Sequence, residues 1–256
     1  MGIGRAAAAA AIGITGLGLL AGCGDWNTQS YSDANGVGQS FSSVRFVNDS
    51  GQVTIRTGDT AEVKREVHYG DEKPGDTFRV KDGVLELNPC DKRNCWIDYE
   101  VTVPEGTTVS GELDSGEVDI SGVAQANVRA SSGKVTVKDV SGAVNIEAQS
   151  GEVNLEGIDG PVVAKAESGS IDARGIGGST TVESSSGNVV VELTQVADVH
   201  VNAQSGNVDV TVPDGDYKVA TSADSGNVDS DFDDDPGAEH SIDLHTDSGN
   251  VRVSAA

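Results

Sequence analysis

The segment Ser150-Gly151-Glu152-Val153-Asn154-Leu155 returns 18 residues later as Ser168-Gly169-Ser170-Ile171-Asp172-Ala173, and this repetition decides the fold. The Ser-Gly pair is usually followed by alternating polar and apolar residues. It recurs at Ser115, Ser132, Ser150, Ser168, Ser186, Ser205, Ser225 and Ser248. A fixed period near 18 residues with strand-like alternation is typical of a stacked repeat, in which each unit buries its apolar side against the next.

A change of parity shows that each period contains a corner. Val199, Val201 and Ala203 have odd numbers, whereas Val208 and Val210 have even numbers. One straight strand cannot keep all of these side chains on one face, so the chain must turn at the Ser-Gly pair, where glycine accepts a positive φ. The sequence therefore predicts an all-β, single-domain β-solenoid of two-strand coils, each about 18 residues long.

The composition excludes one class of partner. The 256 residues carry 41 acidic and 17 basic side chains, for a formal net charge of -24. Such a surface repels phosphate backbones, so we expect no binding of nucleic acid.

The N-terminus has the pattern of an export signal. Residues 1–22 contain a basic start, an apolar run and small residues before Cys23. Leu20-Ala21-Gly22-Cys23 resembles the bacterial lipobox, in which cleavage precedes a cysteine that receives acyl chains such as palmitate. This resemblance predicts lipidation of Cys23 and an extracytoplasmic protein held at the bacterial cell membrane. A soluble secreted protein is the alternative, and a transmembrane helix fits poorly because the run is short.

Three regions follow the predicted signal peptide. Residues 23–40 are polar and rich in Gly and Ser, and are predicted to be a flexible tether. Residues 41–110 alternate in strand fashion and include Asp49-Ser50-Gly51-Gln52-Val53, which predicts a first coil followed by an inserted β cap. Residues 111–256 hold the solenoid repeats. In the cap, Cys90 and Cys95 are predicted to form a disulfide, since two thiols without a nearby histidine are too few ligands for zinc.

Few side chains have a spacing that indicates chemistry. The repeated serines lack a base at a fixed offset and are interpreted as structural. The asparagines that follow glycine in the last four repeats are interpreted as a ladder along one edge. Asp229, Asp231, Asp233 and Asp235 form the densest acidic cluster, which predicts a solvated loop with weak calcium binding as the alternative. We expect no cofactor and no catalytic residues.

A carbohydrate-active enzyme on a β-helix is the main catalytic alternative. No aromatic residue occurs between Tyr99 and Tyr217, although sugar sites commonly use aromatic faces. The sequence therefore favours a protein that is not an enzyme.

Taken together, these segments resemble a known family. The lipobox, Asn48-Asp49-Ser50-Gly51-Gln52-Val53-Thr54-Ile55, a cysteine-containing insertion, Val103-Pro104-Glu105-Gly106 and serial Ser-Gly-x-Val-x-Val units are similar to the bacterial putative-adhesin family. The resemblance implies exported proteins with a stacked β-repeat, often lipoproteins in actinobacteria, and brings no catalytic residues.

The resulting functional prediction is a membrane-anchored adhesion, interaction or structural envelope module. Its partners would be envelope polymers or another protein, contacted along outward residues such as Glu117, Asp119, Glu152, Asn154, Asn207 and Asp209. The alternative is an envelope sensory or regulatory protein that docks on a membrane partner near its cap.

Overall fold

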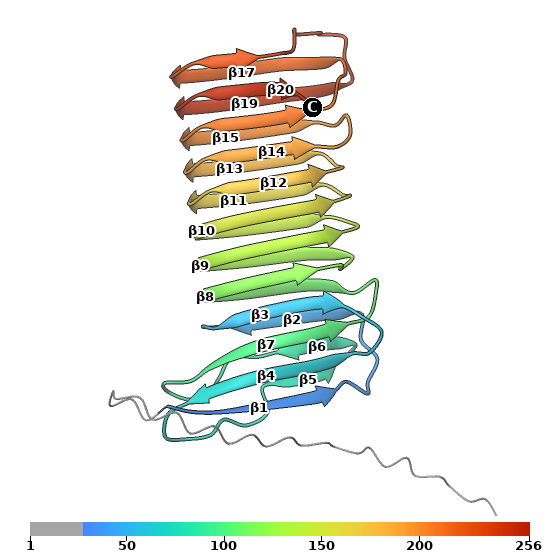
Figure 1. The fold of residues 1–256 in the computed structure, drawn as a ribbon, viewed down its shortest axis with the longest axis vertical. Coiled ribbons are helices and arrows are strands. Elements are labelled where there is room, and N and C mark those ends of the chain that lie inside the picture. The colour runs from blue at the N-terminus through green and yellow to red at the C-terminus, as the bar shows by residue number, and fades with distance from the viewer. Residues whose placement is uncertain (1–27) are drawn as a thin grey trace, which may run out of the picture.

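The computed structural model describes residues 28–256, which form twenty β-strands and no α-helix. The predicted signal peptide and Cys23 lie outside the described residues. In the described part of the chain, no helix is long and apolar enough to span a membrane. The strands belong to one sheet that winds into a rod, with its axis running across the strands (Figure 1). The predicted all-β solenoid is confirmed.

Each coil of the rod contributes to two facing walls. The segments before each Ser-Gly pair form the first wall, and the segments after it form the second wall. In three coils one long strand runs through both walls: β8 (Thr108–Ser121), β9 (Gln125–Val140) and β10 (Val144–Ile158). In the next three coils the walls hold separate strands: β11 (Val162–Ser168), β12 (Ile171–Ile176), β13 (Thr180–Ser186), β14 (Val189–Leu193), β15 (Val199–Ser205) and β16 (Val208–Val212).

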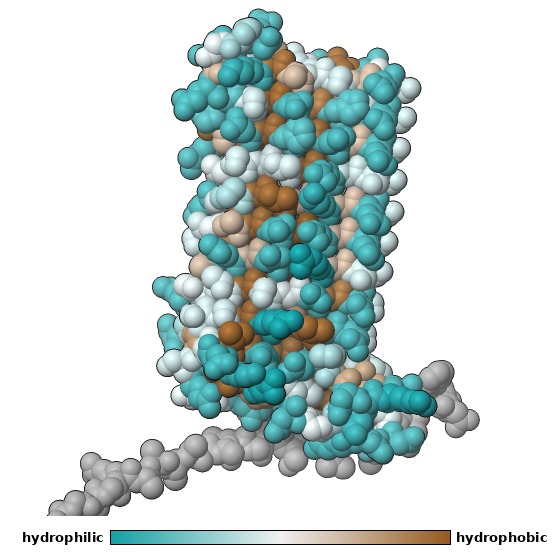
Figure 2. All heavy atoms as spheres, turned by 180° about the vertical axis from the view of Figure 1, so that it is seen from behind, coloured by the Kyte–Doolittle hydropathy of each residue, from teal (hydrophilic) through white to brown (hydrophobic). Residues whose placement is uncertain are grey.

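The core lies between the walls. Neighbouring coils are parallel and in register, so that Val144 is paired with Ala126 of the preceding coil and with Val162 of the next. Alternate side chains point inward, and those of Ile146 and Leu155 are buried from opposite walls of one coil. The face drawn in Figure 2 is mostly polar, with a narrow, broken apolar line along the axis. The alternation at period two thus produces a thin apolar core inside a polar coat.

The Ser-Gly pairs form the corner between the walls. Gly133, Gly151 and Gly169 all have positive φ, at 123°, 127° and 133°. A β-carbon on Gly151 would overlap the backbone carbonyl of Gly133, and one on Gly169 would overlap that of Gly151. Both conditions exclude other residues, which explains why glycine recurs at this position.

The N-terminal region begins the same stack. Strands β2 (Ser43–Asn48) and β3 (Gln52–Thr57) pair in parallel with the two halves of β8. Glu117 donates its backbone N–H to the carbonyl oxygen of Gly51 over 3.2 Å. Ser50-Gly51 is therefore the first corner of the ladder, as the sequence predicts.

Five further strands extend the walls beyond this first coil. They are β1 (Gln29–Gly36), β4 (Glu62–Tyr69), β5 (Phe78–Lys81), β6 (Val84–Leu87) and β7 (Trp96–Val103). β7 pairs in parallel with β3, while β4 pairs antiparallel with both β7 and β1. On the first wall β6 pairs with β2, and β5 with β6. These strands cover the apolar end of the stack, which a free solenoid end would expose.

β1 differs from the sequence-based prediction of a flexible tether through residue 40. All eight of its residues are in register with β4. The buried guanidinium of Arg65 holds the strand by donating from Nε and Nη2 to the two carboxylate oxygens of Asp33, each over 2.8 Å. Polar composition indicated a linker, but this bidentate charge-assisted pair and a full ladder of backbone bonds make the segment an edge strand.

The predicted disulfide between Cys90 and Cys95 is present, with 5.9 Å between the two Cα atoms. It closes a short loop that leads into β7. Both cysteines pack against the core.

The C-terminal coils do not stack in sequence order. The final coil, β19 (His240–Ser248) and β20 (Val251–Ala255), lies between β15–β16 and the preceding coil, β17 (Tyr217–Ser225) and β18 (Val228–Ser230). Figure 1 shows β17 at the extremity of the rod, beyond β19 and β20. The predicted asparagine ladder follows this order, since Asn207 accepts from Asn250, and Asn250 accepts from Asn227.

Burial explains why the last coil is internal. The inward side chains of Ile242, Leu244 and Val251 are 0–1% exposed, whereas Val228 of the outermost coil is 44% exposed. Among the inward positions of β17, Tyr217 is buried, whereas Val219, Thr221 and Ala223 are only partly buried and are less apolar as a set. Placing the more apolar coil inside removes more apolar surface from water.

Candidate binding groove

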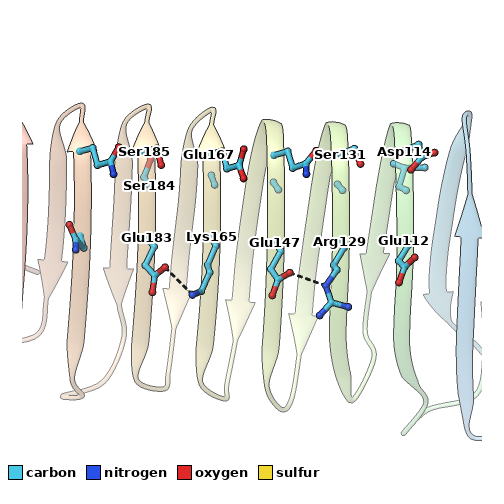
Figure 3. Close-up of a pocket in the computed structure, with 17 residues that line it drawn as sticks. Glu112, Asp114, Arg129, Ser131, Glu147, Lys165, Glu167, Glu183, Ser184 and Ser185 are labelled. Atoms are coloured by element: carbon cyan, nitrogen blue, oxygen red, sulfur yellow. Dashed lines mark hydrogen bonds and ion pairs between the residues drawn. The ribbon is translucent and has the colours of Figure 1, made fainter.

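A groove of about 660 Å³ runs along the first wall, across the strands from β8 to β15. It has two polar sides and a floor of small residues (Figure 3). The sides come from outward positions two residues apart on each strand, and the floor from the residue between them. The floor consists of Leu113, Ala130, Ala148, Ala166 and Ser184.

The floor is regular because the coils are in register. Ala130 is paired with Leu113 and Ala148, and Ala166 with Ala148 and Ser184. Their side chains, which are short except for that of Leu113, point toward the core and are nearly fully buried. The polar side chains on the two sides of the groove therefore repeat once per coil, at a spacing of about 4.8 Å.

One side of the groove alternates in charge. Glu112, Arg129, Glu147, Lys165 and Glu183 lie in this order along the rod (Figure 3). Arg129 Nε donates to Glu147 Oε2 over 2.8 Å, and Lys165 Nζ lies 2.9 Å from Glu183 Oε2. The hydrogen bond to Glu147 raises the pKa of the Arg129 guanidinium. Both ion pairs are about half exposed, so they can exchange for a ligand at small cost.

The opposite side is mainly uncharged. It presents the hydroxyls of Ser131 and Ser185 and the amides of Gln149 and Gln204, with Asp114 and Glu167 as its two carboxylates. Hydroxyls and amides both donate and accept hydrogen bonds.

This arrangement suits an extended polar chain that runs parallel to the rod axis. The groove crosses six coils, which corresponds to about 24 Å at the usual spacing between strands. Its sides offer donors and acceptors at a regular interval, and its charges are of both signs. A repeating polymer could make the same charged contact at every second coil.

The outward residues predicted as the contact surface lie on the second wall instead. Glu117 and Glu152 flank Lys134 in the register, and Lys134 Nζ lies 3.8 Å from Glu152 Oε2. Asn207 lies in this same row, and Asp119, Asn154 and Asp209 lie in the neighbouring outward row of the wall. Sequence reasoning missed the groove, although aligning the repeats places Glu112, Arg129 and Glu147 in one column.

The acidic cluster predicted as a calcium candidate is distributed over separate contacts. Asp229 Oδ2 accepts from Arg252, Asp231 Oδ2 from the backbone N–H of Ala255, and Asp235 Oδ1 from that of Gly237. Asp233 is exposed. Within the described residues, these four carboxylates do not converge on one point.

The loop that carries this cluster covers the open edge of β17. Asp234 Oδ1 accepts from the backbone N–H of Val219, and Asp235 donates its own N–H to the carbonyl oxygen of Tyr217. Phe232 packs edge-to-face on Tyr217, with 5.4 Å between ring centroids. These contacts satisfy part of an edge that could otherwise pair with another strand.

Comparison with known proteins gives a family and a fold. The family model described as Toastrack DUF4097 matches residues 41–254. None of the curated proteins matches the chain. The structure of a putative adhesin from Bacteroides fragilis is similar with a TM-score of 0.51 and 13% identity, covering 89% of this chain and 97% of that one. A putative adhesin from Parabacteroides distasonis has a TM-score of 0.38 at 13% identity, with 89% and 97% covered.

Proposed function

The chain belongs to the Toastrack DUF4097 family, and from this premise we propose that it is a non-catalytic adhesion or interaction module of the bacterial cell surface. The observation that carries the proposal is the groove on the first wall, where the same charge recurs at every second coil and offers a polar polymer a repeating set of contacts. The fold that this chain shares with the Bacteroides fragilis putative adhesin supports the adhesive role.

We further propose that acyl chains on Cys23 anchor the rod with its cap toward the membrane. Five residues separate Cys23 from the start of β1 at Gln29, a span of at most about 20 Å. Nine of the 17 basic residues lie within residues 41–110. Residues 198–256 contain 13 acidic residues and only Lys218 and Arg252 as basic ones. The less acidic end would therefore face the anionic membrane surface, and the strongly acidic end would project from it.

Substitution of Cys23 by alanine tests the anchor. We expect Cys23→Ala to move the protein from the membrane fraction to the culture medium, because no acyl chain would be attached. The Cys90→Ser and Cys95→Ser double variant is the matched control and should stay with the membrane. Retention of Cys23→Ala in the membrane fraction would contradict the anchor but not the groove.

Charge reversal in the groove tests the binding surface. The Arg129→Glu and Lys165→Glu double variant replaces both cations of the groove and leaves the second wall intact. The control is Lys134→Glu with Lys138→Glu, which makes the same change in net charge on the second wall.

The readouts are sedimentation with purified cell-wall sacculi and crosslinking capture from intact cells. We expect the groove variant to lose most of the binding and the control to keep it. Equal loss in both variants would assign binding to general charge, and equal retention would place the contact elsewhere.

A further inference from the structure

The reversed order of the last coils creates a cluster that the sequence does not indicate. On the first wall, β19 lies directly beside β17, and the pairs Ala223–Thr246 and Ser225–Ser248 are in register. Between these pairs, the outward side chains of Asp224 and Asp247 face the same side of the wall. His245, two residues before Asp247 on β19, points to the same face.

These three side chains converge. One imidazole nitrogen of His245 and one carboxylate oxygen each of Asp224 and Asp247 lie within 4.8 Å of one another. His245 Nε2 is 2.9 Å from Asp247 Oδ1, and its Nδ1 is 2.8 Å from Ser222 Oγ. The ring is therefore held at both nitrogens, with Nε2 directed at the carboxylates.

The two carboxylates lack a compensating charge. Within residues 28–256, Asp247 has an ion-pair partner only in His245, and Asp224 has none. Lys218, the basic residue of β17, lies at the far end of that strand. Like charges on adjacent strands are unfavourable, so a bound cation would stabilise the arrangement.

The rest of the row has one similar juxtaposition, but without a histidine. The equivalent positions along the rod are Asp49, Asp114, Ser131, Gln149, Glu167, Ser185 and Gln204. Asp49 lies beside Asp114 in the register, whereas Glu167 has only neutral neighbours in the row. Of the two acidic pairs in the row, only Asp247 and Asp224 are accompanied by a histidine.

We propose that Asp224, His245 and Asp247 form a binding site for a first-row divalent metal ion such as Zn²⁺ or Mn²⁺. One imidazole nitrogen with two carboxylates is a donor set that suits these ions, whereas Ca²⁺ requires six to eight oxygen ligands. In the metal-bound tautomer, His245 Nδ1–H would donate to Ser222 Oγ, which leaves the Nε2 lone pair free for the metal. Because the site is exposed, its remaining coordination positions are open to water or to a ligand from a partner.

Ser222, His245 and Asp247 also form a serine–histidine–aspartate chain, which has the residue types of a nucleophilic triad but contacts the two ring nitrogens in the opposite order. Two features favour the metal. Asp224 adds a second carboxylate on the same side of the ring, which a triad does not use. The groove described above does not include Ser222, which is exposed on the wall.

Metal titration of the full chain, purified in detergent and stripped with EDTA, tests the proposal. Isothermal titration with ZnCl₂ and with MnCl₂ should give one site per chain for at least one of the two ions. His245→Gln and Asp247→Asn should each weaken binding by about tenfold or more, and Ser222→Ala by less, since it only orients the ring. Cys23 is present in every variant, so its thiol contributes equally.

The matched control is His200→Gln. His200 pairs with Asp243 over 3.0 Å on the same wall, but only two groups meet there. This variant should bind metal like the unmodified chain, and circular dichroism should show that all variants are folded. Absent binding, or equal binding by the unmodified chain and His245→Gln, would overturn the proposal. So would EDTA-resistant hydrolysis of p-nitrophenyl acetate that is lost in Ser222→Ala, since the cluster would then be a nucleophilic site.

Discussion

Gly206 donates its backbone N–H to the carbonyl oxygen of Ser248, 2.9 Å away, and Gly249 in turn donates to Ser225. The ladder of Ser-Gly corners thus passes from the coil of β15 and β16 to the coil of β19 and β20. Only then does it reach the coil of β17 and β18, which comes earlier in the sequence. The end of the polypeptide is an internal layer of the rod.

This order predicts the effect of a C-terminal truncation. A chain that ends after Glu239 lacks β19 and β20, which are the strand partners of β17 and β18. We expect residues 213–239 to lose amide-exchange protection and to become sensitive to protease, while β15 and β16 stay protected. A chain that ends after Ser254 is the control and should remain protected throughout. If the coils were stacked in sequence order, β17 and β18 would survive the longer truncation.

A second prediction concerns the glycine corner. Gly151→Ala combines a φ of 127° with overlap on the carbonyl of Gly133. We expect a loss of about 2–3 kcal/mol in the free energy of unfolding, measured by urea denaturation. Gly75→Ala is the matched control, because no atom lies within 4 Å of the added carbon. Its effect should stay within about 0.5 kcal/mol. A Gly151→Ala variant as stable as the control would show that the corner tolerates a side chain.

The sequence predicts much of this fold because a repeat carries its own register. Once Ser150-Gly151 and Ser168-Gly169 are aligned, the pairing of Val153 with Ile171 follows, and so does the corner at each glycine. The strands around Val44, Val63 and Ile97 were likewise predictable from alternation at period two.

The order of the last coils was not predictable from the same pattern. Ser205, Ser225 and Ser248 are each followed by Gly-Asn-Val, so the corner motif cannot distinguish which coil lies beside which. The order of the coils is decided by the difference in their apolar area. Residues such as Leu244 and Thr221 produce this difference, and their effect depends on the whole stack. The site of Asp224 and His245 depends on that order and was missed for the same reason.

β1 and the groove were missed for other reasons. β1 is polar, and its stability comes from a pairing with β4 and from the contact between Asp33 and Arg65, more than thirty residues away. The groove depends on the alternation of charge between repeats, from Glu112 to Arg129 to Glu147, which appears only when the coils are laid side by side.

A third prediction concerns the disulfide between Cys90 and Cys95. Replacing both cysteines by serine should lower the free energy of unfolding by about 2 kcal/mol, since the bridge closes a short loop and restricts the unfolded chain. Thermal unfolding of the unmodified chain with and without reductant should show a similar difference. The reductant should then have no effect on the double variant. A reductant effect that persists in the double variant would assign it to something other than this bridge.

The last prediction is a loss of stability at alkaline pH caused by Tyr99. Its side chain is 2% exposed, and its hydroxyl lies 2.7 Å from both Thr77 Oγ1 and the carbonyl oxygen of Asn88. Burial raises the pKa of Tyr99 to about 12, from 10.0 for an ordinary tyrosine.

Stability falls with rising pH because the folded state disfavours the ionised form of Tyr99. A folded-state pKa above the unfolded one means that the folded protein resists loss of the proton. The contribution to stability is therefore complete below pH 10 and is lost as the pH rises toward 12. A difference of two pKa units corresponds to about 3 kcal/mol at the upper end of this range.

Urea unfolding between pH 9 and pH 12 measures this loss, and Tyr99→Phe is the diagnostic variant. Phenylalanine has no proton to lose, so the fall in stability across this range should be smaller by about 3 kcal/mol than in the unmodified chain. The variant should be the less stable protein at pH 9, because the hydroxyl contacts with Thr77 and Asn88 are removed. The two unfolding free energies should therefore converge as the pH rises. Parallel curves for the two proteins would show that Tyr99 does not control the alkaline transition.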